Sequence, residues 1–494
     1  MNRLIIVYDD SAQPLPEVTN IIGERKFGDI QMDRQSIRSA MFDLFSSASP
    51  DPEPIVLRLD DTAGIPSLCE RVAFEESRLG APVRVLHYFS DFIFADRETA
   101  KAAVKSCAFT ERVYAAGQDG KPVFYAFPSA DDYTQFLARA QEAGGTDLPA
   151  RGVAASDIRL NGNEFVHIGN ADGLVACLTR RYDARFFNRL ETSEYTVTKV
   201  SQNREKIKAE YTFWHLLPDE MKMWFVMPFD YREDATSASY RMERLHVPNL
   251  SVKYVHGAMG AEEFEDVLRR FFHFLGSRAS RPVSRADYAA LADKTYLQKT
   301  EERISRLKAD PKYAPVAALL ASGTAYGSID AVYERFLALY RSAFASLKGK
   351  PLAVVGHGDP CFSNILFDRA TKTLKFVDPK GALTEDALWA DPYYDLCKLS
   401  HSVCGLYDFF NSAIYEITLD DSLQLRLSIP FNNETYRQAF RRTVEQSGYD
   451  YRFVRIGEAA LFLSMLPLHI DNPHKVLGFI LNAIRIMDET EQRA

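Results

Sequence analysis

The sequence predicts an α/β N-terminal domain over residues 1–180, followed by an α+β part with a small strand-rich lobe over 181–250 and a helical lobe over 251–494. In the first part, short apolar runs alternate with helical patterns, which is typical of a parallel or mixed sheet covered by helices. After about residue 184, strand patterns surround a single helix. From about residue 261, apolar residues recur at helical spacing. A chain of 494 residues is long enough for two or three such domains.

The elements of the first part are predicted from where the apolar runs begin and end. A stretch with three glycines, residues 144–152, is predicted to be a loop. The strands are predicted at 4–8, 54–59, 83–88 and 123–127, and the helices at 67–79, 97–107 and 130–143.

In the second part, residues 195–200 alternate as a strand and residues 204–217 form a helix. Two further strands are predicted at Met223–Pro228 and Ala238–Arg244. After a mostly helical stretch, a strand is expected at Leu352–Val355, followed by a hairpin that pairs residues 365–367 with residues 374–377.

Composition excludes several classes of protein. The net charge is −8, which argues against a nucleic-acid-binding protein because such proteins usually carry a basic face. No apolar run reaches about 18 residues, so no membrane span is expected. The six cysteines are scattered without a C-x-x-C pair, which favours a reduced, cytoplasmic protein.

One segment after the middle of the chain, Val355–Gly381, carries side chains suited to phosphoryl transfer. Its loop presents His357, Asp359 and Asn364, and its second turn presents Asp378. A carboxylate can orient an acceptor hydroxyl and take its proton. Mg²⁺ prefers the oxygen ligands that an amide and a carboxylate supply. Phosphoryl transfer needs little more from a protein than positioning and charge neutralisation.

The alternative is that His357-Gly-Asp is an ordinary turn and that Asn364 merely ends a strand. An isolated His-Gly-Asp favours that interpretation. The combination with an asparagine five residues after Asp359 and a Phe-Val-Asp after a hairpin favours the functional one.

On these residues, the second part resembles the aminoglycoside phosphotransferase and choline kinase group, which has a protein-kinase-like fold. The resemblance covers roughly residues 184–490. It implies that Asp359, with His357, is catalytic, and that Asn364 and Asp378 bind Mg²⁺. It also implies ATP, or GTP, as the phosphoryl donor.

The same resemblance implies a strand lysine paired with a helix glutamate in the small lobe, and Lys199 and Glu210 are the candidates. Met242 and Glu243 are expected in the hinge segment that lies along the nucleotide base. The alternatives are a solvated lysine at a strand end, a solvated glutamate on a helix face and an ordinary edge strand.

An aspartate after the metal turn commonly supports the catalytic loop in this group, and Asp391 and Asp395 are the candidates. Asp395 is expected to hydrogen-bond the backbone amides of the loop. His401 and Tyr407 are candidates for the acceptor site, although a lone helical histidine is more often structural.

The sequence departs from the group in two places. The segment 185–193 contains no glycine, so a glycine-rich phosphate loop is missing. The metal turn is Asp378-Pro-Lys-Gly rather than Asp-Phe-Gly. Lys380 in this turn is a candidate for a phosphate contact, and a solvated turn lysine is the alternative.

The first part is similar to sugar-nucleotide nucleotidyltransferases, which have a Rossmann-like, GT-A type fold. Asp91 after the strand at 83–88 resembles their metal-binding acid, and Glu164–Gly169 resembles their closing strand. Their glycine-rich loop after the first strand, which wraps a triphosphate with backbone N–H groups, is absent here. We therefore expect a degenerate domain. An active transferase with altered chemistry is the alternative.

Together these features predict an ATP- and Mg²⁺-dependent kinase that acts on a hydroxyl of a sugar, polyol or amino alcohol. If both domains are as expected, the pairing hints at surface-polysaccharide precursor metabolism, by analogy alone. The alternatives are a catalytically silent nucleotide-binding scaffold and a bifunctional kinase and nucleotidyltransferase. The expected partners are a nucleoside triphosphate and a small hydroxylated acceptor, with no nucleic acid.

Overall fold

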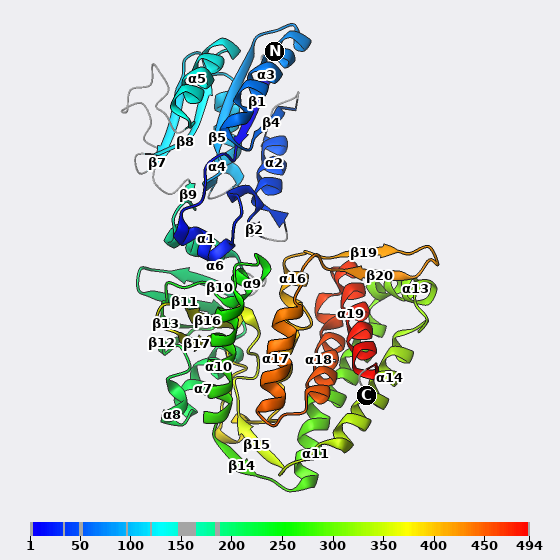
Figure 1. The fold of residues 1–494 in the computed structure, drawn as a ribbon. Coiled ribbons are helices and arrows are strands. Elements are labelled where there is room, and N and C mark those ends of the chain that lie inside the picture. The colour runs from blue at the N-terminus through cyan, green and yellow to red at the C-terminus, as the bar shows by residue number, and fades with distance from the viewer. Residues whose placement is uncertain are drawn as a thin grey trace. The chain divides into compact units, whose positions relative to one another are not determined.

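The computed structural model describes residues 3–32, 35–48, 53–94, 97–118, 121–146, 165–182 and 188–492. The chain forms two compact units (Figure 1). The first comprises Met1–Tyr182 with the short segment His256–Ala258, and the second comprises Asp183–Val255 and Met259–Ala494. Among the described residues, no helix is both long and apolar enough to cross a membrane.

The first unit is built on a five-stranded mixed sheet. Strand β1 (Arg3–Asp9) pairs in parallel with β4 (Ile55–Leu59) on one side and β5 (Val83–Phe89) on the other. Strands β8 (Lys121–Phe127) and β7 (Tyr114–Gln118) complete it in antiparallel orientation. Every residue from Leu4 to Tyr8 in β1 is buried, which explains its uninterrupted apolar run.

Two pairs of helices accompany this sheet. Helix α2 (Ile37–Ala48) contacts α4 (Arg97–Cys107), and α3 (Ile65–Leu79) contacts α5 (Ala130–Ala143). The four predicted strands and three predicted helices are confirmed to within two residues, whereas β7 was not predicted as a strand. The remaining elements are α1 (Pro16–Ile22), β2 (Gln31–Met32), β3 (Gln35–Ser36), β6 (Phe92–Phe94), β9 (Phe165–His167) and α6 (Ala171–Tyr182).

The second unit begins with a small antiparallel sheet in the order β10-β11-β13-β12. Helix α7 (Arg204–Leu216) packs against β11, β12 and β13. Ile207 on this helix joins Val226 and three strand residues in a small hydrophobic core. The strands are β10 (Asn188–Thr192), β11 (Thr196–Ser201), β12 (Pro228–Glu233) and β13 (Ala238–Glu243).

The predicted strand at Met223–Pro228 is wrong, because β12 begins only at Pro228. Trp224, Phe225 and Val226 are all buried, so this apolar run fills the core instead of alternating between two faces. Two backbone hydrogen bonds, from Val226 N to Phe376 O and from Phe376 N to Trp224 O, attach the run to the hairpin that follows β15.

Three short strands and a hairpin form the framework between the small sheet and the helices. Strand β15 (Leu352–Val355) lies between β14 (Ser280–Pro282) and β18 (Trp389–Ala390). Strands β16 (Ile365–Asp368) and β17 (Thr373–Phe376) form the predicted hairpin, with Ile365 opposite Phe376.

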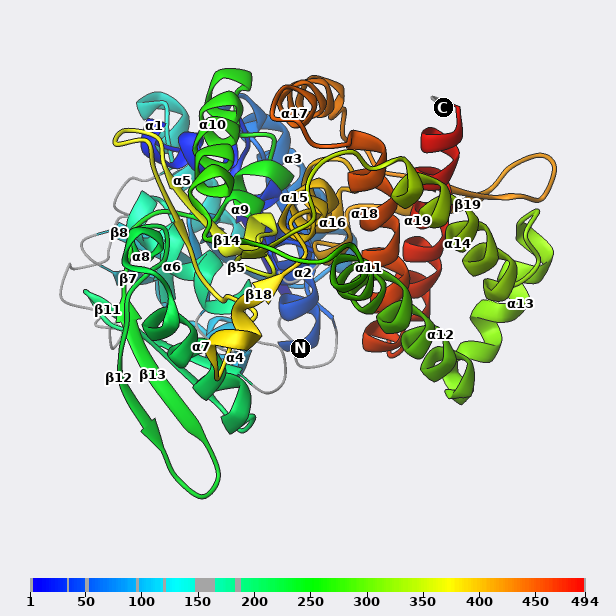
Figure 2. The same ribbon diagram turned by 90° about the horizontal axis from the view of Figure 1, so that it is seen from below.

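The rest of the unit is mostly helical, as predicted, except for a hairpin of two strands, β19 and β20, that was not predicted. Helix α18 contacts α12, α14, α15 and α19, and it runs beside α19 in Figures 1 and 2. A single large hydrophobic core joins these helices. The elements are α8 (Asp219–Lys222), α9 (Leu250–Val255), α10 (Ala261–Ser277), α11 (Arg285–Asp293), α12 (Lys299–Ala309), α13 (Ala314–Gly323), α14 (Ile329–Ser346), α15 (Tyr394–Val403), α16 (Tyr407–Asn411), β19 (Glu416–Leu419), β20 (Leu425–Ser428), α17 (Glu434–Gln446), α18 (Tyr451–Met465) and α19 (Pro473–Glu491).

Candidate active site

The loop after β15 is held by a carboxylate of helix α15. Asp395 accepts hydrogen bonds from the backbone N–H of His357 at 3.1 Å and of Gly358 at 2.9 Å. Only glycine fits at position 356, since a Cβ there would lie 2.5 Å from Asp395 Oδ2. Arg278 Nη1 lies 3.3 Å from the same oxygen and balances its buried charge. Asp395 therefore has the contacts expected of a residue that supports this loop.

His357 ties the loop to the turn after β17. Its Nδ1 accepts from the N–H of Asp359 at 3.0 Å, and its Nε2 lies 2.8 Å from the carbonyl oxygen of Val377. Burial lowers the pKa of His357, so the ring is neutral at pH 7 and Nε2 carries the proton. Because the backbone occupies both nitrogens, this geometry supports a positioning role for His357 instead of the catalytic role that the sequence predicts.

Asp359 lies at the open end of the loop, with 41% of its side chain exposed. Its Oδ1 is 2.8 Å from Nζ of Lys398 on α15. Burial acts to raise the pKa of Asp359, but Lys398 outweighs burial and the pKa is lowered. The carboxylate is therefore ionised at neutral pH and accessible to a ligand.

The hairpin brings Asn364 and Asp378 to the same end of strands β16 and β17. Asn364 directly precedes β16, and the N–H of Val377 donates to its carbonyl oxygen at 3.1 Å. The side-chain Nδ2 of Asn364 donates to the carbonyl oxygen of Asp359 at 2.8 Å. This bond turns the amide nitrogen toward the loop, and the amide oxygen accepts one long hydrogen bond, from the hydroxyl of Ser363 at 3.4 Å.

Asp378 also meets a lysine from the small sheet. Nζ of Lys199 on β11 lies 2.7 Å from Asp378 Oδ1 and 2.8 Å from Glu210 Oε2 on α7. The Lys199 side chain is only 3% exposed. Burial acts to lower the pKa of Lys199, but Asp378 leads the charges that raise it well above the ordinary value. The alternatives of a solvated lysine and a solvated glutamate are wrong for this pair.

The turn that carries Asp378 is strained and closely packed. Asp378 has a φ of 55°, in the left-handed region that asparagine and aspartate tolerate best among residues with a Cβ. Gly381 has a φ of 87°, and a Cβ there would lie 2.9 Å from the backbone of Glu210. The N–H of Ala382 donates to the carbonyl oxygen of Ala209 at 3.0 Å. These contacts pack the turn closely against helix α7, which carries Glu210.

The residues present fit a magnesium ion that is shared with a nucleotide. Lys199 engages Oδ1 of Asp378, so Oδ2 and the amide oxygen of Asn364 are the two hard donors available. Mg²⁺ keeps several waters and takes its other ligands from phosphates, so two protein oxygens suffice. Within the described ranges, no group of three or more His, Cys, Asp or Glu side chains forms a metal cage.

The expected hinge residues lie at the end of β13. The Met242 side chain is buried in the small-lobe core, and Met242 pairs with Val197 in β11 and Pro228 in β12. Glu243 pairs with Thr196 and ends the strand. β13 is flanked by strands on both sides, so the alternative of an ordinary edge strand is wrong for Met242. The contact of either residue with a nucleotide stays a prediction.

Asp391 lies apart from the loop and is buried among tyrosines. Its Oδ1 accepts from the hydroxyl of Tyr296 at 2.8 Å and from the N–H of Tyr393 at 2.9 Å, and its Oδ2 is buried without a hydrogen bond. Burial raises the pKa of Asp391 to about 6. The Asp391 carboxyl therefore has a structural role, since it binds the backbone just before α15 and the hydroxyl of Tyr296.

We expect Asp391→Asn to flatten the pH dependence of stability. Since the folded-state pKa is raised, the stabilising contribution of Asp391 is complete below its unfolded pKa of about 4 and is lost as the pH rises through about 6. As the pH rises through that window, the free energy of unfolding of the wild type should fall by about 2 kcal/mol relative to that of the variant. Urea denaturation at several pH values measures this. Exposed Asp386→Asn is the control, and parallel curves for Asp391→Asn and wild type would contradict the assignment.

Sequence reasoning missed two loop-binding residues on α15. Lys398 contacts Asp359, and the Ser402 hydroxyl accepts from the N–H of Phe362 at 3.0 Å. With Asp395 they form a polar stripe at i, i+3 and i+7 on one face of the helix. That spacing of polar residues on one helix face is the signal in the sequence that points to them.

His401 lies one turn beyond Lys398 and is fully buried. Its ring stacks on Tyr407 at a centroid distance of 4.3 Å and lies 4.2 Å from the ring of Phe462. Neither ring nitrogen has a hydrogen-bond partner among the described residues. Burial lowers the pKa of His401 well below its ordinary value, so the ring is neutral. Its place in an acceptor site stays a prediction.

The first unit brings two of its highlighted residues together. His167 Nε2 on β9 lies 3.5 Å from Asp91 Oδ2, at the start of β6. Strands β6 and β9 pair in antiparallel orientation, with Phe92 opposite His167. Glu164 and residues 147–152 lie outside the described residues, as do residues 185–187 of the glycine-free segment. The resemblance of this unit to nucleotidyltransferases stays a prediction.

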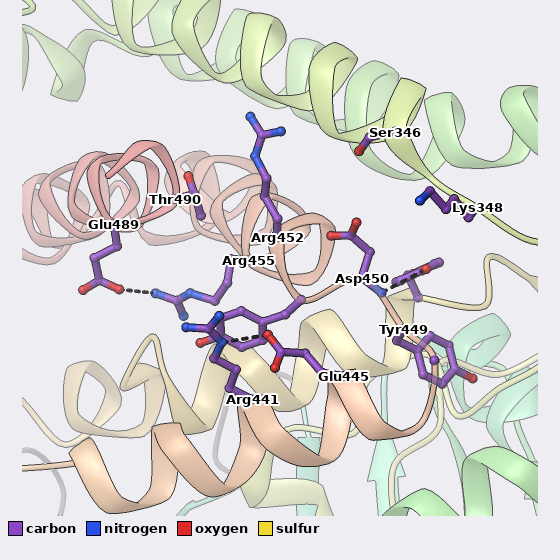
Figure 3. Close-up of a pocket in the computed structure, with 13 residues that line it drawn as sticks. Ser346, Lys348, Arg441, Glu445, Tyr449, Asp450, Arg452, Arg455, Glu489 and Thr490 are labelled. Carbon is purple, nitrogen blue, oxygen red and sulfur yellow. Dashed lines mark hydrogen bonds and ion pairs between the residues drawn. The ribbon is translucent and has the colours of Figure 1, made fainter. Parts of the chain in front are cut away.

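A cavity of about 490 Å³ lies elsewhere, between α14, α17, α18 and α19 (Figure 3). Arg441 pairs with Glu445, and Arg455 pairs with Glu489, so charges of both signs compensate one another on its wall. None of the predicted site residues lines this cavity. It belongs to the helical lobe and not to the candidate active site.

Comparison with known proteins returned matches only among solved structures. No protein-family model and no curated protein sequence matches the chain. A thermostable mutant of aminoglycoside phosphotransferase APH(4)-Ia, in its apo form, is 12% identical with a TM-score of 0.34, over 61% of this chain and 94% of its own. A thermostable mutant of the same enzyme in a ternary complex with ADP and hygromycin B is 13% identical with a TM-score of 0.36, over 61% of this chain and 93% of its own.

Ethanolamine kinase from Plasmodium vivax is 12% identical with a TM-score of 0.36, over 62% of this chain and 80% of its own. These structural neighbours are small-molecule phosphotransferases. At such low identities and TM-scores, their activities do not transfer to this chain.

Proposed function

We propose that this protein is an ATP- or GTP-dependent kinase that uses Mg²⁺ to phosphorylate a hydroxyl group of a small molecule. The observation that carries the proposal is the ion pair of Lys199 with Asp378, two residues 179 positions apart in the sequence. Burying a lysine with two carboxylates costs desolvation energy, which favours a functional role for this group. A nucleoside triphosphate would supply that role, because its phosphates attract the lysine and the cation that they carry attracts the Asp378 carboxylate.

In this proposal each residue of the site has a role. Lys199 contacts the nucleotide phosphates as a point charge, and Glu210 holds its ammonium in place. Asn364 and Asp378 would hold Mg²⁺, which when bound neutralises charge on the transferring phosphoryl group. Backbone groups near Met242 and Glu243 would contact the base.

Asp359 receives the acceptor hydroxyl. The hydroxyl oxygen forms a bond to the γ-phosphorus while the bond from that phosphorus to the β–γ bridging oxygen breaks, and the nucleoside diphosphate leaves. The hydroxyl proton passes to Asp359. His357 and Asp395 hold the loop in the geometry that this step requires.

The alternative is a catalytically silent scaffold that binds nucleotide without transferring phosphate. Asp359 argues against the scaffold, because its carboxylate is ionised and 41% exposed, as proton transfer from an acceptor hydroxyl requires. A bifunctional protein would require a triphosphate site in the first unit as well, and that unit's first strand is followed by no glycine-rich loop.

Calorimetry with the full chain tests the proposal. We expect Mg·ATP or Mg·GTP to bind with a Kd in the micromolar range and binding to weaken strongly in EDTA. A screen of sugars, polyols and amino alcohols for nucleoside diphosphate release then identifies the acceptor. Absence of binding by both nucleotides would contradict the kinase and the nucleotide-binding scaffold alike, whereas nucleotide binding without transfer to any acceptor would favour the scaffold.

A further inference from the structure

Helix α15 contacts the catalytic loop at three successive points. Asp395 accepts from the N–H of Gly358, Lys398 pairs with Asp359, and Ser402 accepts from the N–H of Phe362. The first and last contacts are hydrogen bonds to backbone N–H groups, so they fix the conformation of the loop. The middle contact is different, because a cation meets the one carboxylate that faces the acceptor.

The charge of Asp359 is cancelled within the protein. Nζ of Lys398 lies 2.8 Å from Asp359 Oδ1, and the Lys398 side chain is 13% exposed, so water screens the pair only in part. The lysine takes one carboxylate oxygen and leaves Oδ2 for the acceptor hydroxyl. The ion pair thereby limits rotation of the Asp359 carboxylate about the Cβ–Cγ bond.

The histidine one turn beyond Lys398 adds no charge to this wall. Burial lowers the pKa of His401 well below its ordinary value, so the ring is neutral. The other carboxylate of α15 that reaches the loop, Asp395, is paired with Arg278 at 3.3 Å and with loop N–H groups. The side chain of α15 that meets Asp359 is therefore a cation, and its neighbour on the same face is neutral.

We infer that Lys398 is a positioning residue that clamps and neutralises Asp359, and that the acceptor is consequently a neutral or anionic hydroxyl compound, not an amino alcohol. This inference rests on the proposed kinase function and narrows its acceptor. An ammonium group beside the reacting hydroxyl would face Lys398, and the carboxylate that could receive it, Asp359, is already paired with that lysine. Like charges at such short range are strongly unfavourable in a partly desolvated site.

Matched acceptors that differ by one ammonium group test the inference. Glucose with glucosamine and glycerol with 3-amino-1,2-propanediol are suitable pairs. Wild-type protein should favour the neutral member by about tenfold or more in kcat/KM. Nucleoside diphosphate release in a coupled assay measures both members.

Variants at Lys398 separate positioning from a general structural role. Lys398→Met should lower kcat by about tenfold to hundredfold with little change in the KM for Mg·ATP, and should shrink the preference for the neutral acceptor. Lys398→Arg keeps the charge and should retain the preference. Lys308→Met is the control, since it removes an exposed ion pair with Asp330 that is far from the loop in sequence.

The outcomes distinguish the inference from the proposed function. Failure of the wild-type protein to bind Mg·ATP or Mg·GTP would reject the kinase. Binding and transfer with a preference for ammonium-bearing acceptors would overturn this inference alone, as would Lys398→Met with wild-type kcat and selectivity. Slow hydrolysis of ATP, with water as the acceptor, gives a second readout of kcat. Protein that binds nucleotide but transfers phosphate to no acceptor, including water, would reject both.

Discussion

Replacing Asp359 by asparagine lowers kcat by about 10²–10⁴-fold and leaves the Kd of Mg·ATP nearly unchanged, if the carboxylate handles the acceptor proton. The amide keeps the shape of the side chain but neither takes a proton nor orients the hydroxyl as a charged acceptor would. Lys398 loses its counterion in this variant, so some thermal stability is also lost. The measurement is steady-state turnover together with calorimetry on the same preparation.

Asp386→Asn is the matched control for Asp359→Asn, because Asp386 is exposed in the segment that follows the metal turn. It should behave as wild type in both assays. Turnover of Asp359→Asn near the wild-type value would contradict the assignment of Asp359. A parallel loss of nucleotide binding would instead indicate that the whole loop had collapsed.

Replacing Asp378 by alanine should abolish Mg²⁺-dependent nucleotide binding. Asp378 supplies the charged donor beside Asn364, and its Oδ1 also anchors Lys199. Losing both functions at once removes the site for the phosphates and their cation. Calorimetry with Mg·ATP, with and without EDTA, measures the effect, and unchanged affinity would reject Asp378 as a ligand.

Asp378→Asn refines this experiment. The φ of 55° at this residue penalises alanine, whereas asparagine tolerates the left-handed region, so only the charge changes. We expect weak residual Mg·ATP binding in the asparagine variant and none in the alanine variant. If the two variants lose Mg·ATP binding to the same extent and have the same melting temperature, the missing charge accounts for the whole loss.

The hairpin of β16 and β17 was predictable because its geometry is local. Residues 365–376 alternate and turn at Asp368–Thr373, so the register that places Asn364 near Asp378 follows from the sequence pattern alone. The pairing of Lys199 with Glu210 was predicted by resemblance, across a strand and the adjacent helix. The strand at Met223–Pro228 was wrong because an apolar run does not reveal whether it lies in a sheet or in a core.

The partners of Asp359 and His357 were not predictable by the same means. Lys398 lies far along the chain from Asp359, on a separate helix. His357 looked catalytic from its place in His-Gly-Asp, but its ring is occupied by the backbone of Asp359 and Val377. Long-range packing decides such contacts. The polar spacing on α15 marks a face of the helix but does not tell which loop atom each side chain meets.

By itself, the sequence determined the α/β first unit, the strand-rich and helical lobes of the second, and the residue types of the loop that we propose for phosphoryl transfer. These follow from local hydrophobic spacing and short-range turns, and the contact of Asp395 with the loop was expected from the resemblance. Only the tertiary structure decided that Lys199 meets Asp378 and that Lys398 neutralises Asp359. Each of these contacts joins segments distant in the chain, so it exists only once the core that brings them together has formed.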